Sequence, residues 1–228
     1  MKPRTSSLSL VLISLLLTNL SSAESQWIDL FDGESVEAWK AYRGDDFPSD
    51  SWIVEEGVLT SQAEAARTDI VTRQQFSDFE LELEWRLEPR GNSGIFFRVN
   101  EETNSIWHAA PEYQILDDTP ETPPIHATGS LYDLLPPNKN KKMRPVGEFN
   151  ETRIVAKGDK IEHWLNGEKI LSYDFNNAEL KEGIRSSKFG VHPEFAQSRE
   201  GSIGLQHHGD SVGFRKIRIR EISPSNEK

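Results

Sequence analysis

The strongest constraint on the fold is a strict alternation of apolar and charged residues in the segment DFELELEWRL, residues 78–87. Apolar side chains occupy every odd position from Phe79 to Leu87, and charged side chains fill the even positions between them. Successive side chains of an extended strand point to opposite faces, whereas a helix repeats every 3.6 residues. This segment is therefore predicted to be a β-strand with one face in a core and the other face outside it.

Shorter runs of the same kind recur along the chain, and turn-forming Gly, Asn, Asp or Pro residues separate most of them. They are SWIVEEGVLT, GIFFRV, PEYQIL, ETRIVAKG, KIEHWLNG, EKILSYDF, GSIGLQHHG and VGFRKIRIREI. The pair Asn166-Gly167 predicts a tight hairpin turn. Only AELKEGIRSS could supply a short helix. Many short strands joined by turns indicate an all-β protein, either a sandwich or a jelly roll.

The first residues resemble a secretory signal peptide. Lys2 and Arg4 form a short basic region, and the apolar run that follows is too short to span a bilayer. Ser21-Ser22-Ala23 matches a signal peptidase site. We therefore expect residues 1–23 to be removed, residues 24–228 to form a single domain, and the product to be exported to the periplasm or the extracellular space without membrane insertion.

The composition narrows the classes of partner. Without the two basic residues of the leader, 24 Lys and Arg residues face 37 Asp and Glu residues, a net charge of −13. Such a charge disfavours nucleic acids and anionic membrane surfaces as partners. The sequence contains no cysteine, which excludes disulfide bonds and thiolate chemistry.

A proline-rich segment, residues 117–147, interrupts the strand pattern and contains a basic cluster from Lys139 to Lys142. It cannot form a central strand, because proline lacks the backbone donor that a strand needs. Loops of this length inside a domain commonly carry a site.

Several polar residues fall on strand faces that point away from the core. In GIFFRV, the alternation assigns Ile95, Phe97 and Val99 to the core and places Arg98 on the outer face. The other residues predicted to face outward are Glu84, Glu112, Gln114, Gln206 and His208. Solvation of exposed carboxylates, or an ion pair between Arg98 and a nearby glutamate, explains part of this set equally well.

Three aromatic or imidazole side chains leave alternatives open. Trp164 is either a platform for stacking a sugar or an ordinary aromatic residue at a rim. His163 shares a face with apolar residues, so packing is favoured over ligand binding. His207 and His208 are adjacent and point to opposite sides of a strand, which disfavours a bidentate metal pair and favours His208 alone.

No familiar nucleophile or phosphate-binding motif is present. The sequence lacks the G-x-S-x-G, H-E-x-x-H, P-loop and G-x-G-x-x-G patterns in the required context. Paired carboxylates exist, but the sequence does not give the separation that distinguishes retaining from inverting glycosidases.

Seven blocks of sequence together resemble the 3-keto-disaccharide hydrolase family of exported bacterial proteins, over about residues 26–221. In order they are WIDLFDGESVEAW, WIVEEGVL, DFELELEWRLEPRGNSGIFFR, EYQILDD, TGSLYDLLPP, EFNETRIVAKGDKIEHWLNGEKILSYD and GSIGLQHHGDSVGFRKIRIREI. The resemblance implies a concanavalin A-like lectin/glucanase jelly roll of two antiparallel sheets. It also implies cleavage of 3-keto-glycosides and 3-keto-disaccharides, whose ketone an upstream sugar oxidoreductase would supply.

A ketone at C3 acidifies the C2 proton, so a base can form an enolate and the C1 substituent can leave by elimination or net hydrolysis. The resemblance assigns Glu112 and His208 to acid/base catalysis and Arg98 to stabilising negative charge. The residues it assigns to the pocket are Glu84, Gln114, Tyr132, Asp133 and Gln206, and Trp164 is the candidate sugar platform. It also makes a divalent metal, held by a subset of Glu112, Asp133 and His208, a hypothesis to test.

Two positions depart from the family pattern: His207 stands where aspartate is usual, and Gly213 where an aromatic residue is usual. A changed rim could mean a different leaving group. The alternatives to an enzyme are a non-catalytic, lectin-like carbohydrate-binding module, because jelly rolls host both, and a surface assembly protein with a vestigial groove.

Overall fold

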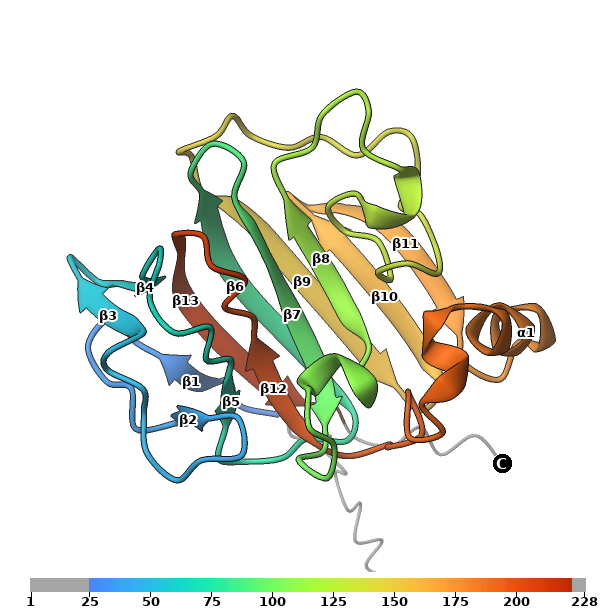
Figure 1. Cartoon of the computed structure of the whole chain (residues 1–228), viewed down its shortest axis with the longest axis horizontal. Coiled ribbons are helices and arrows are strands. Elements are labelled where there is room, and N and C mark those ends of the chain that lie inside the picture. Colours follow the sequence, from blue (N-terminus) through green and yellow to red (C-terminus); the bar gives the residue numbers. More distant parts are fainter. Residues whose placement is uncertain (1–24, 223–228) are drawn as a thin grey trace, which may run out of the picture.

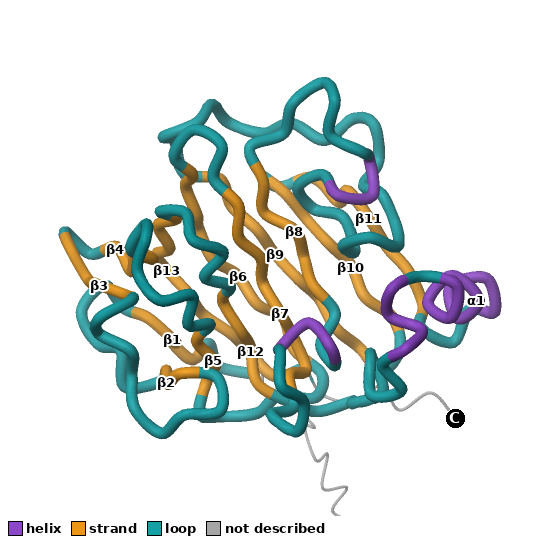
Figure 2. The backbone as a smooth tube through the Cα atoms, in the orientation of Figure 1, coloured by secondary structure: helices purple, strands orange, loops and turns teal. Residues whose placement is uncertain are grey.

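Two antiparallel β-sheets pack face to face, as Figure 1 shows for the computed structural model, which describes residues 25–222. Figure 2 shows the strands side by side in the two sheets and the loops that join them. The all-β sandwich predicted from the alternation is therefore confirmed. The predicted signal peptide lies outside the described residues.

The larger sheet has eight strands. They are β1 (Ile28–Phe31), β3 (Trp52–Glu55), β4 (Val58–Ser61), β6 (Phe79–Leu87), β9 (Asn150–Lys157), β10 (Lys160–Leu165), β11 (Glu168–Asp174) and β13 (Val212–Glu221). Their order is β11-β10-β9-β6-β13-β4-β3, and β1 pairs with the C-terminal half of β13. The strand from Phe79 to Leu87 lies in the middle of this sheet, with both neighbours antiparallel.

The smaller sheet has five strands in the order β2-β5-β12-β7-β8. They are β2 (Trp39–Ala41), β5 (Ile70–Thr72), β7 (Asn92–Val99), β8 (Glu112–Leu116) and β12 (Ser202–Leu205). The helical segments are α1 (Ala178–Ser186) and the short 3₁₀ turns η1 (Ile106–His108), η2 (Pro124–His126) and η3 (Lys188–Val191). The Asn177 side chain caps α1 by accepting from the backbone N–H groups of Glu179 and Leu180.

The core lies between the two sheets. Phe79, Leu81, Leu83 and Trp85 of β6 are almost fully buried there, as the alternation predicts. The smaller sheet contributes Ile95, Phe97, Tyr113, Ile115, Ile203 and Leu205. His163 lies inside this core with no exposed surface; its Nδ1 is 3.0 Å from the carbonyl of Gly129, so it packs as predicted.

The hairpin between β10 and β11 also forms as predicted. Asn166 and Gly167 both have positive φ angles, 48° and 84°, as a primed two-residue turn requires. The segment from 117 to 147 contains no named strand and only the turn η2, in agreement with its proline content.

A β-bulge in β7 overturns the predicted positions of Arg98 and Val99. Ser202 pairs with Val99 and Gly204 with Phe96, so β7 has one extra residue here, and Arg98 takes a φ of +54°. The alternation shifts by one position, and Val99 joins Phe96 in a small cluster apart from the main core. Arg98 is therefore buried, only 2% exposed, and does not project from the outer face.

No helix among residues 25–222 is long and apolar enough to cross a membrane.

Candidate functional site

A polar pocket of about 190 Å³ lies on the outward face of the smaller sheet. The residues that line it are Asn92, Trp107, Glu112, Gln114, Tyr132, Lys188, Gln206 and His208. Five of them, Glu112, Gln114, Tyr132, Gln206 and His208, are among the nine site residues predicted from the sequence. The structure thus brings together residues from β7, β8, the end of β12, the proline-rich loop and two 3₁₀ turns.

The sheet register explains why three of these residues, Glu112, Gln114 and Gln206, meet. The backbone N–H of Gln206 donates to the carbonyl of Gly94 (3.0 Å), and Gly94 pairs with Gln114 across β7 and β8. Residues paired side by side point to the same face, and so do residues two positions apart on one strand. Glu112 therefore shares the face of Gln114, and the alternation that buries Tyr113 and Ile115 turns both polar side chains to the pocket.

Gly94 makes room for the Glu112 side chain. A β-carbon at position 94 would overlap with the carboxyl group of Glu112, which lies across the strand at this point. The glycine in GNSGIFFR therefore serves close packing of a neighbouring carboxyl against the backbone.

Glu112 is the most perturbed carboxyl group in the pocket. Its pKa is raised from 4.5 to about 8: burial is the main cause, the Lys188 ammonium group opposes it, and the negative charge of Asp69 adds to it. Only 6% of the residue is exposed, and the residues described include no side chain hydrogen-bonded to its carboxylate. A carboxyl group with a pKa near 8 exchanges protons close to neutral pH, which suits acid/base chemistry.

Lys188, the first residue of η3, brings a positive charge to the pocket. Its Nζ lies 4.3 Å from the ring centre of Tyr132 and 5.4 Å from that of Trp107, both within cation–π range. Asp133 Oδ2 is 3.8 Å from the same Nζ. The ammonium group is thus held between aromatic rings and can stabilise negative charge that develops in the pocket.

His208 is tied to the sheet through amide groups. Its Nδ1 is 3.3 Å from Nδ2 of Asn92, and Nε2 of Gln114 donates to Oδ1 of Asn92 (3.2 Å). Burial and the nearby positive charge of Arg67 lower the pKa of His208, so its imidazole is neutral at neutral pH. With the Asn92 amide as donor, the neutral ring carries its proton on Nε2.

His207 points away from the pocket, as the alternation predicts for adjacent histidines. It is 2% exposed and packs edge-on against Trp52, with ring centres 5.8 Å apart. Its Nδ1 accepts from the backbone N–H of Gly209 (3.2 Å). Since His207 does not line the pocket, its departure from the family pattern does not change the pocket lining directly.

Four residues predicted for the site do not line the pocket: Glu84, Arg98, Asp133 and Trp164. Arg98 is turned inward by the bulge, where Nε and Nη2 donate to the carbonyl of Ser77 (3.2 and 3.0 Å) and Nη2 lies 3.5 Å from Asp78. Trp164 lies on the outward face of the larger sheet, with the guanidinium group of Arg153 3.8 Å from its ring centre. Neither side chain lines the pocket.

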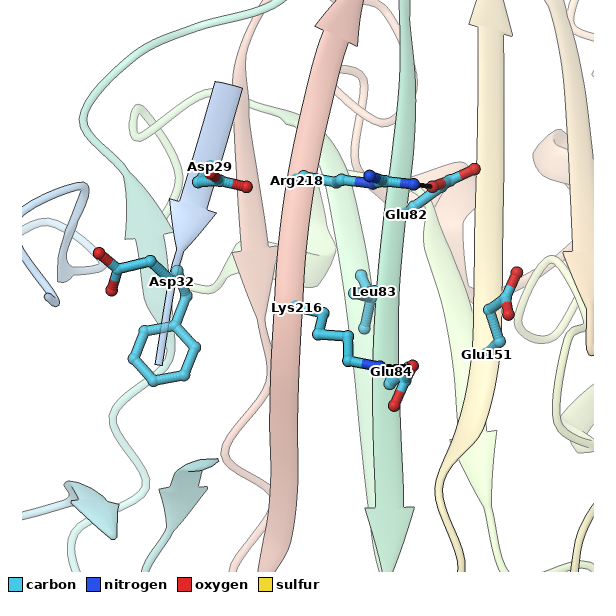
Figure 3. Close-up of a pocket in the computed structure, with 9 residues that line it drawn as sticks. Asp29, Asp32, Glu82, Leu83, Glu84, Glu151, Lys216 and Arg218 are labelled. Atoms are coloured by element: carbon cyan, nitrogen blue, oxygen red, sulfur yellow. Dashed lines mark hydrogen bonds and ion pairs between the residues drawn. The ribbon is translucent and has the colours of Figure 1, made fainter. Parts of the chain in front are cut away.

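Glu84 is also on the outward face of the larger sheet, in a separate hollow of about 420 Å³ shown in Figure 3. Its carboxylate accepts from Arg215 Nε and from Lys216 Nζ, both at 2.7 Å. Burial raises its pKa, but these two cations outweigh that effect and leave the pKa below 4.5. The sequence does not show that the outward faces of β6 and β8 belong to different sheets, so the prediction from alternation places Glu84 with Glu112.

The metal hypothesis does not fit the side chains present. Among residues 25–222, no three His, Asp or Glu side chains gather as a metal site would require. Asp133 does not line the pocket; its Oδ1 lies 2.6 Å from Nε2 of His126. Lys188 also places an ammonium group beside Glu112, which disfavours a second cation there. The predicted set of Glu112, Asp133 and His208 is therefore not assembled, and no catalytic step is assigned to a metal.

Sequence patterns did not identify Asn92, Trp107 and Lys188 as pocket residues. Trp107 and Lys188 lie on 3₁₀ turns that are 81 positions apart in the chain, and no periodic pattern relates them. Asn92 could have been found, because it is two residues before Gly94 on the same strand and therefore shares its face.

The fold and the pocket define a jelly-roll protein with a polar pocket on its smaller sheet. The sequence model of the 3-keto-alpha-glucoside-1,2-lyase-like domain matches residues 26–220. The 3-keto-disaccharide hydrolase of Bacteroides thetaiotaomicron is 30% identical, with 86% of this chain and 78% of that protein covered. The chain belongs to this 3-keto-disaccharide hydrolase family, as its sequence blocks indicated.

Solved structures agree with the fold. A Parabacteroides distasonis protein, described as a "putative glycosyl hydrolase", has a TM-score of 0.80 at 30% identity, covering 91% of this chain and 99% of that one. The exoplasmic/lumenal domain of VIP36 has a TM-score of 0.53 at 8% identity, covering 85% of this chain and 87% of that one. The second likeness concerns the fold alone, and it supports the predicted concanavalin A-like class.

Proposed function

We propose that this protein cleaves glycosidic bonds of sugars that carry a ketone at C3. The observation that carries the proposal is a buried Glu112 carboxyl group with a pKa of about 8, facing the Lys188 ammonium group in a small polar pocket. Membership of the family, and the name of the Bacteroides relative, support the substrate class.

The size of the pocket agrees with one sugar ring. Pockets for drug-sized ligands measure about 300–1,000 Å³, and this pocket measures about 190 Å³. Amide groups of Asn92, Gln114 and Gln206 line it and can exchange hydrogen bonds with hydroxyl groups. The side-chain carbonyl of Gln206 is buried without a partner in the part of the chain described, so a sugar hydroxyl would satisfy it.

On this proposal, the Glu112 carboxylate removes the proton from C2 of the keto sugar. The electron pair of the C–H bond moves toward the C3 carbonyl and forms an enolate, whose negative oxygen the Lys188 ammonium group stabilises. Lys188 thus takes the role that the family resemblance implies for Arg98. A raised pKa also makes the Glu112 carboxylate a stronger base than an ordinary glutamate.

The enolate then expels the oxygen substituent of C1, which leaves a double bond between C1 and C2. The departing oxygen takes the proton from the Glu112 carboxyl group, which becomes a carboxylate again. The Nε2–H of His208 can donate a hydrogen bond to the departing oxygen. Addition of water, with hydroxyl to C1 and a proton to C2, converts this elimination into net hydrolysis.

The test is release of the leaving group from a 3-keto-glucoside by the chain without residues 1–23. Glu112→Gln is expected to lower kcat by about 10²–10⁴-fold, the usual contribution of a positioned acid or base. The matched control is Glu84→Gln, a carboxylate on the other sheet, which should change kcat less than about twofold because it touches no residue of the pocket. Equal activity of the wild type and Glu112→Gln would contradict the proposal.

The same assay separates the competing functions. A carbohydrate-binding module would bind unoxidised glucosides and release nothing from the keto form. A parallel reaction with a chelator tests the metal hypothesis, because release that stops and then returns with an added divalent cation would require a metal at the site. We also propose, from the leader sequence, that the protein acts after export and that an enzyme oxidising C3 hydroxyl groups supplies its substrate.

A further inference from the structure

The rim of the pocket carries an exposed aromatic platform that the proposed chemistry does not use. Trp107, in η1, lines the pocket and is 37% exposed, which is unusual for so large an apolar side chain in this protein. Its neighbours on the rim are His108 in the same turn and His192, which follows η3. Tryptophan is enriched at binding interfaces, because its large ring is apolar and its N–H group is polar.

Two stacked imidazole rings hold Trp107 in place. The rings of His108 and His192 are 3.9 Å apart and nearly parallel, at 16°. Both meet the indole at a steep angle, 83° at 4.2 Å for His108 and 88° at 5.2 Å for His192. Within residues 25–222, no aromatic ring stacks flat against Trp107, and the Lys188 Nζ lies over the indole, 5.4 Å from its ring centre. A bound planar ring would therefore displace no stacked aromatic side chain.

The surroundings of the indole favour a planar ligand without a positive charge, because the Lys188 ammonium group already lies over the ring. Burial, together with the neighbouring His192, lowers the pKa of His108, which keeps this ring neutral at neutral pH. The amides that can recognise hydroxyl groups line the sheet floor of the pocket on β7, on β8 and just after β12, whereas η1 presents the Trp107 ring and η3 the Lys188 ammonium group.

The volume of the pocket decides which part of a substrate reaches this rim. A space of about 190 Å³ holds about one sugar ring, well below the usual size of a drug-sized site, about 300–1,000 Å³. If Glu112 acts on that ring, the group attached to C1 must extend out of the pocket. Among the exposed side chains that line the pocket, which are Trp107, Lys188 and His208, Trp107 is the apolar one that can receive it.

We propose that Trp107, supported by His108 and His192, binds the leaving group of the substrate by stacking, and that it favours aromatic leaving groups. The inference rests on the proposed function, since it names the class of leaving group that the same pocket accepts. It makes Trp107 a determinant of specificity rather than a contributor to the bond cleavage.

The test compares the KM values of three substrates, the 3-keto forms of phenyl glucoside, methyl glucoside and a glucose disaccharide. An aromatic stack contributes about 0.5–1.5 kcal/mol, equivalent to roughly a twofold to tenfold change in affinity. Trp107→Ala should therefore raise the KM of the phenyl substrate about fivefold to tenfold, and that of the methyl substrate less than twofold. His192→Ala should produce a smaller change with the same selectivity, because it removes only the support of the indole.

Val146→Ala is the matched control, since Val146 is a similarly exposed apolar side chain, 42% exposed, that does not line the pocket. An equal rise in KM for all three substrates would show that Trp107 contacts the keto sugar and would overturn the inference. A rise confined to the disaccharide would identify a sugar platform and would overturn it as well. Because each variant is compared with the wild type on the same substrate, differences in leaving-group reactivity cancel.

Absence of turnover by the wild type on all three substrates would contradict the proposed function, and calorimetry would then decide the inference separately. Tighter binding of 3-keto phenyl glucoside than of the methyl compound, lost in Trp107→Ala, would support an aromatic subsite. Equal binding of the two compounds by the wild type would overturn it.

Discussion

At the scale of single residues, the chemistry depends on how two opposite effects act on Glu112. Burial makes the ionised carboxylate costly, and the Lys188 ammonium group partly compensates that cost. The result is a group that is mostly protonated at neutral pH and becomes a base above it. The same pairing explains why Lys188 matters although it is 42% exposed: its charge acts on a neighbour that water cannot screen fully.

The pH dependence of kcat/KM tests this pairing. If the carboxylate of Glu112 is the base, kcat/KM should rise about tenfold per pH unit below its pKa and level off above about 8. Lys188→Met should move the inflection to higher pH. The ammonium group lowers the pKa of Glu112, so its removal lets burial raise that pKa further. Glu84→Gln provides the control profile, and an inflection that stays unchanged in Lys188→Met would refute the pairing.

At the scale of elements, the bulge in β7 separates two functions within one strand. Before the bulge, Asn92 and Gly94 face the pocket; after it, Arg98 turns inward to Ser77 and Asp78 and fixes the end of the sandwich. Because of the bulge, one strand contributes residues to the pocket at its start and a buried arginine to the end of the sandwich.

Substitutions at Arg98 should therefore affect stability and leave substrate affinity unchanged. Arg98→Ala removes buried hydrogen bonds to the Ser77 carbonyl and should lower the free energy of unfolding by about 1–3 kcal/mol. Arg98→Gly should be about 1 kcal/mol more stable than Arg98→Ala, because glycine tolerates the positive φ angle. Denaturant unfolding measures both differences. A large rise in KM for either variant would show that Arg98 contacts the substrate and would contradict its structural role.

The sequence predicts regular strands and hairpins well, but it does not predict irregularities such as the bulge in β7. Strict alternation identified β6, and Asn166-Gly167 identified the β10–β11 hairpin, because both signals are local. The alternation also grouped Glu112 with Gln114 correctly. The alternation gives the wrong face for Arg98, because the bulge depends on how β7 pairs with β12 and the sequence GIFFRV contains no signal for it.

The pocket could be predicted only in part for a similar reason. Residues on strands share a face by register, whereas Trp107 and Lys188 come from turns whose approach depends on the whole fold. Glu84 and Trp164 were misassigned because the sequence does not show which strands belong to which sheet.

At the scale of the whole molecule, two buried groups oppose each other in the dependence of stability on pH. Glu112 lies on the outward face of the smaller sheet, and its pKa rises from 4.5 to about 8. His163 lies between the sheets, against Tyr113 of the smaller sheet and Tyr173 of its own sheet, and burial lowers its pKa from 6.5 to about 4. Each group therefore binds protons differently in the folded and unfolded states.

The signs follow from proton counts. Between pH 4.5 and about 8, folded Glu112 holds a proton that the unfolded chain releases, so its contribution to stability is lost as pH rises. Between pH 6.5 and about 4, His163 binds a proton in the unfolded chain but stays neutral in the folded protein, so stability is lost as pH falls. The two slopes, each at most about 1.4 kcal/mol per pH unit, cancel where the windows overlap.

Unfolding free energies measured from pH 4 to pH 9 should separate the two groups. Relative to the wild type, Glu112→Gln should gain stability as pH rises from about 5 to about 8, because the amide cannot ionise. At pH 7, His163→Gln should be less stable than the wild type because glutamine packs less well between the sheets. This difference in stability should shrink as pH falls from about 6.5 to about 4, because only the wild type then loses stability through His163. Parallel curves for the wild type and both variants would show that neither group is buried in its neutral form, and would contradict the state of Glu112 on which the proposed catalysis depends.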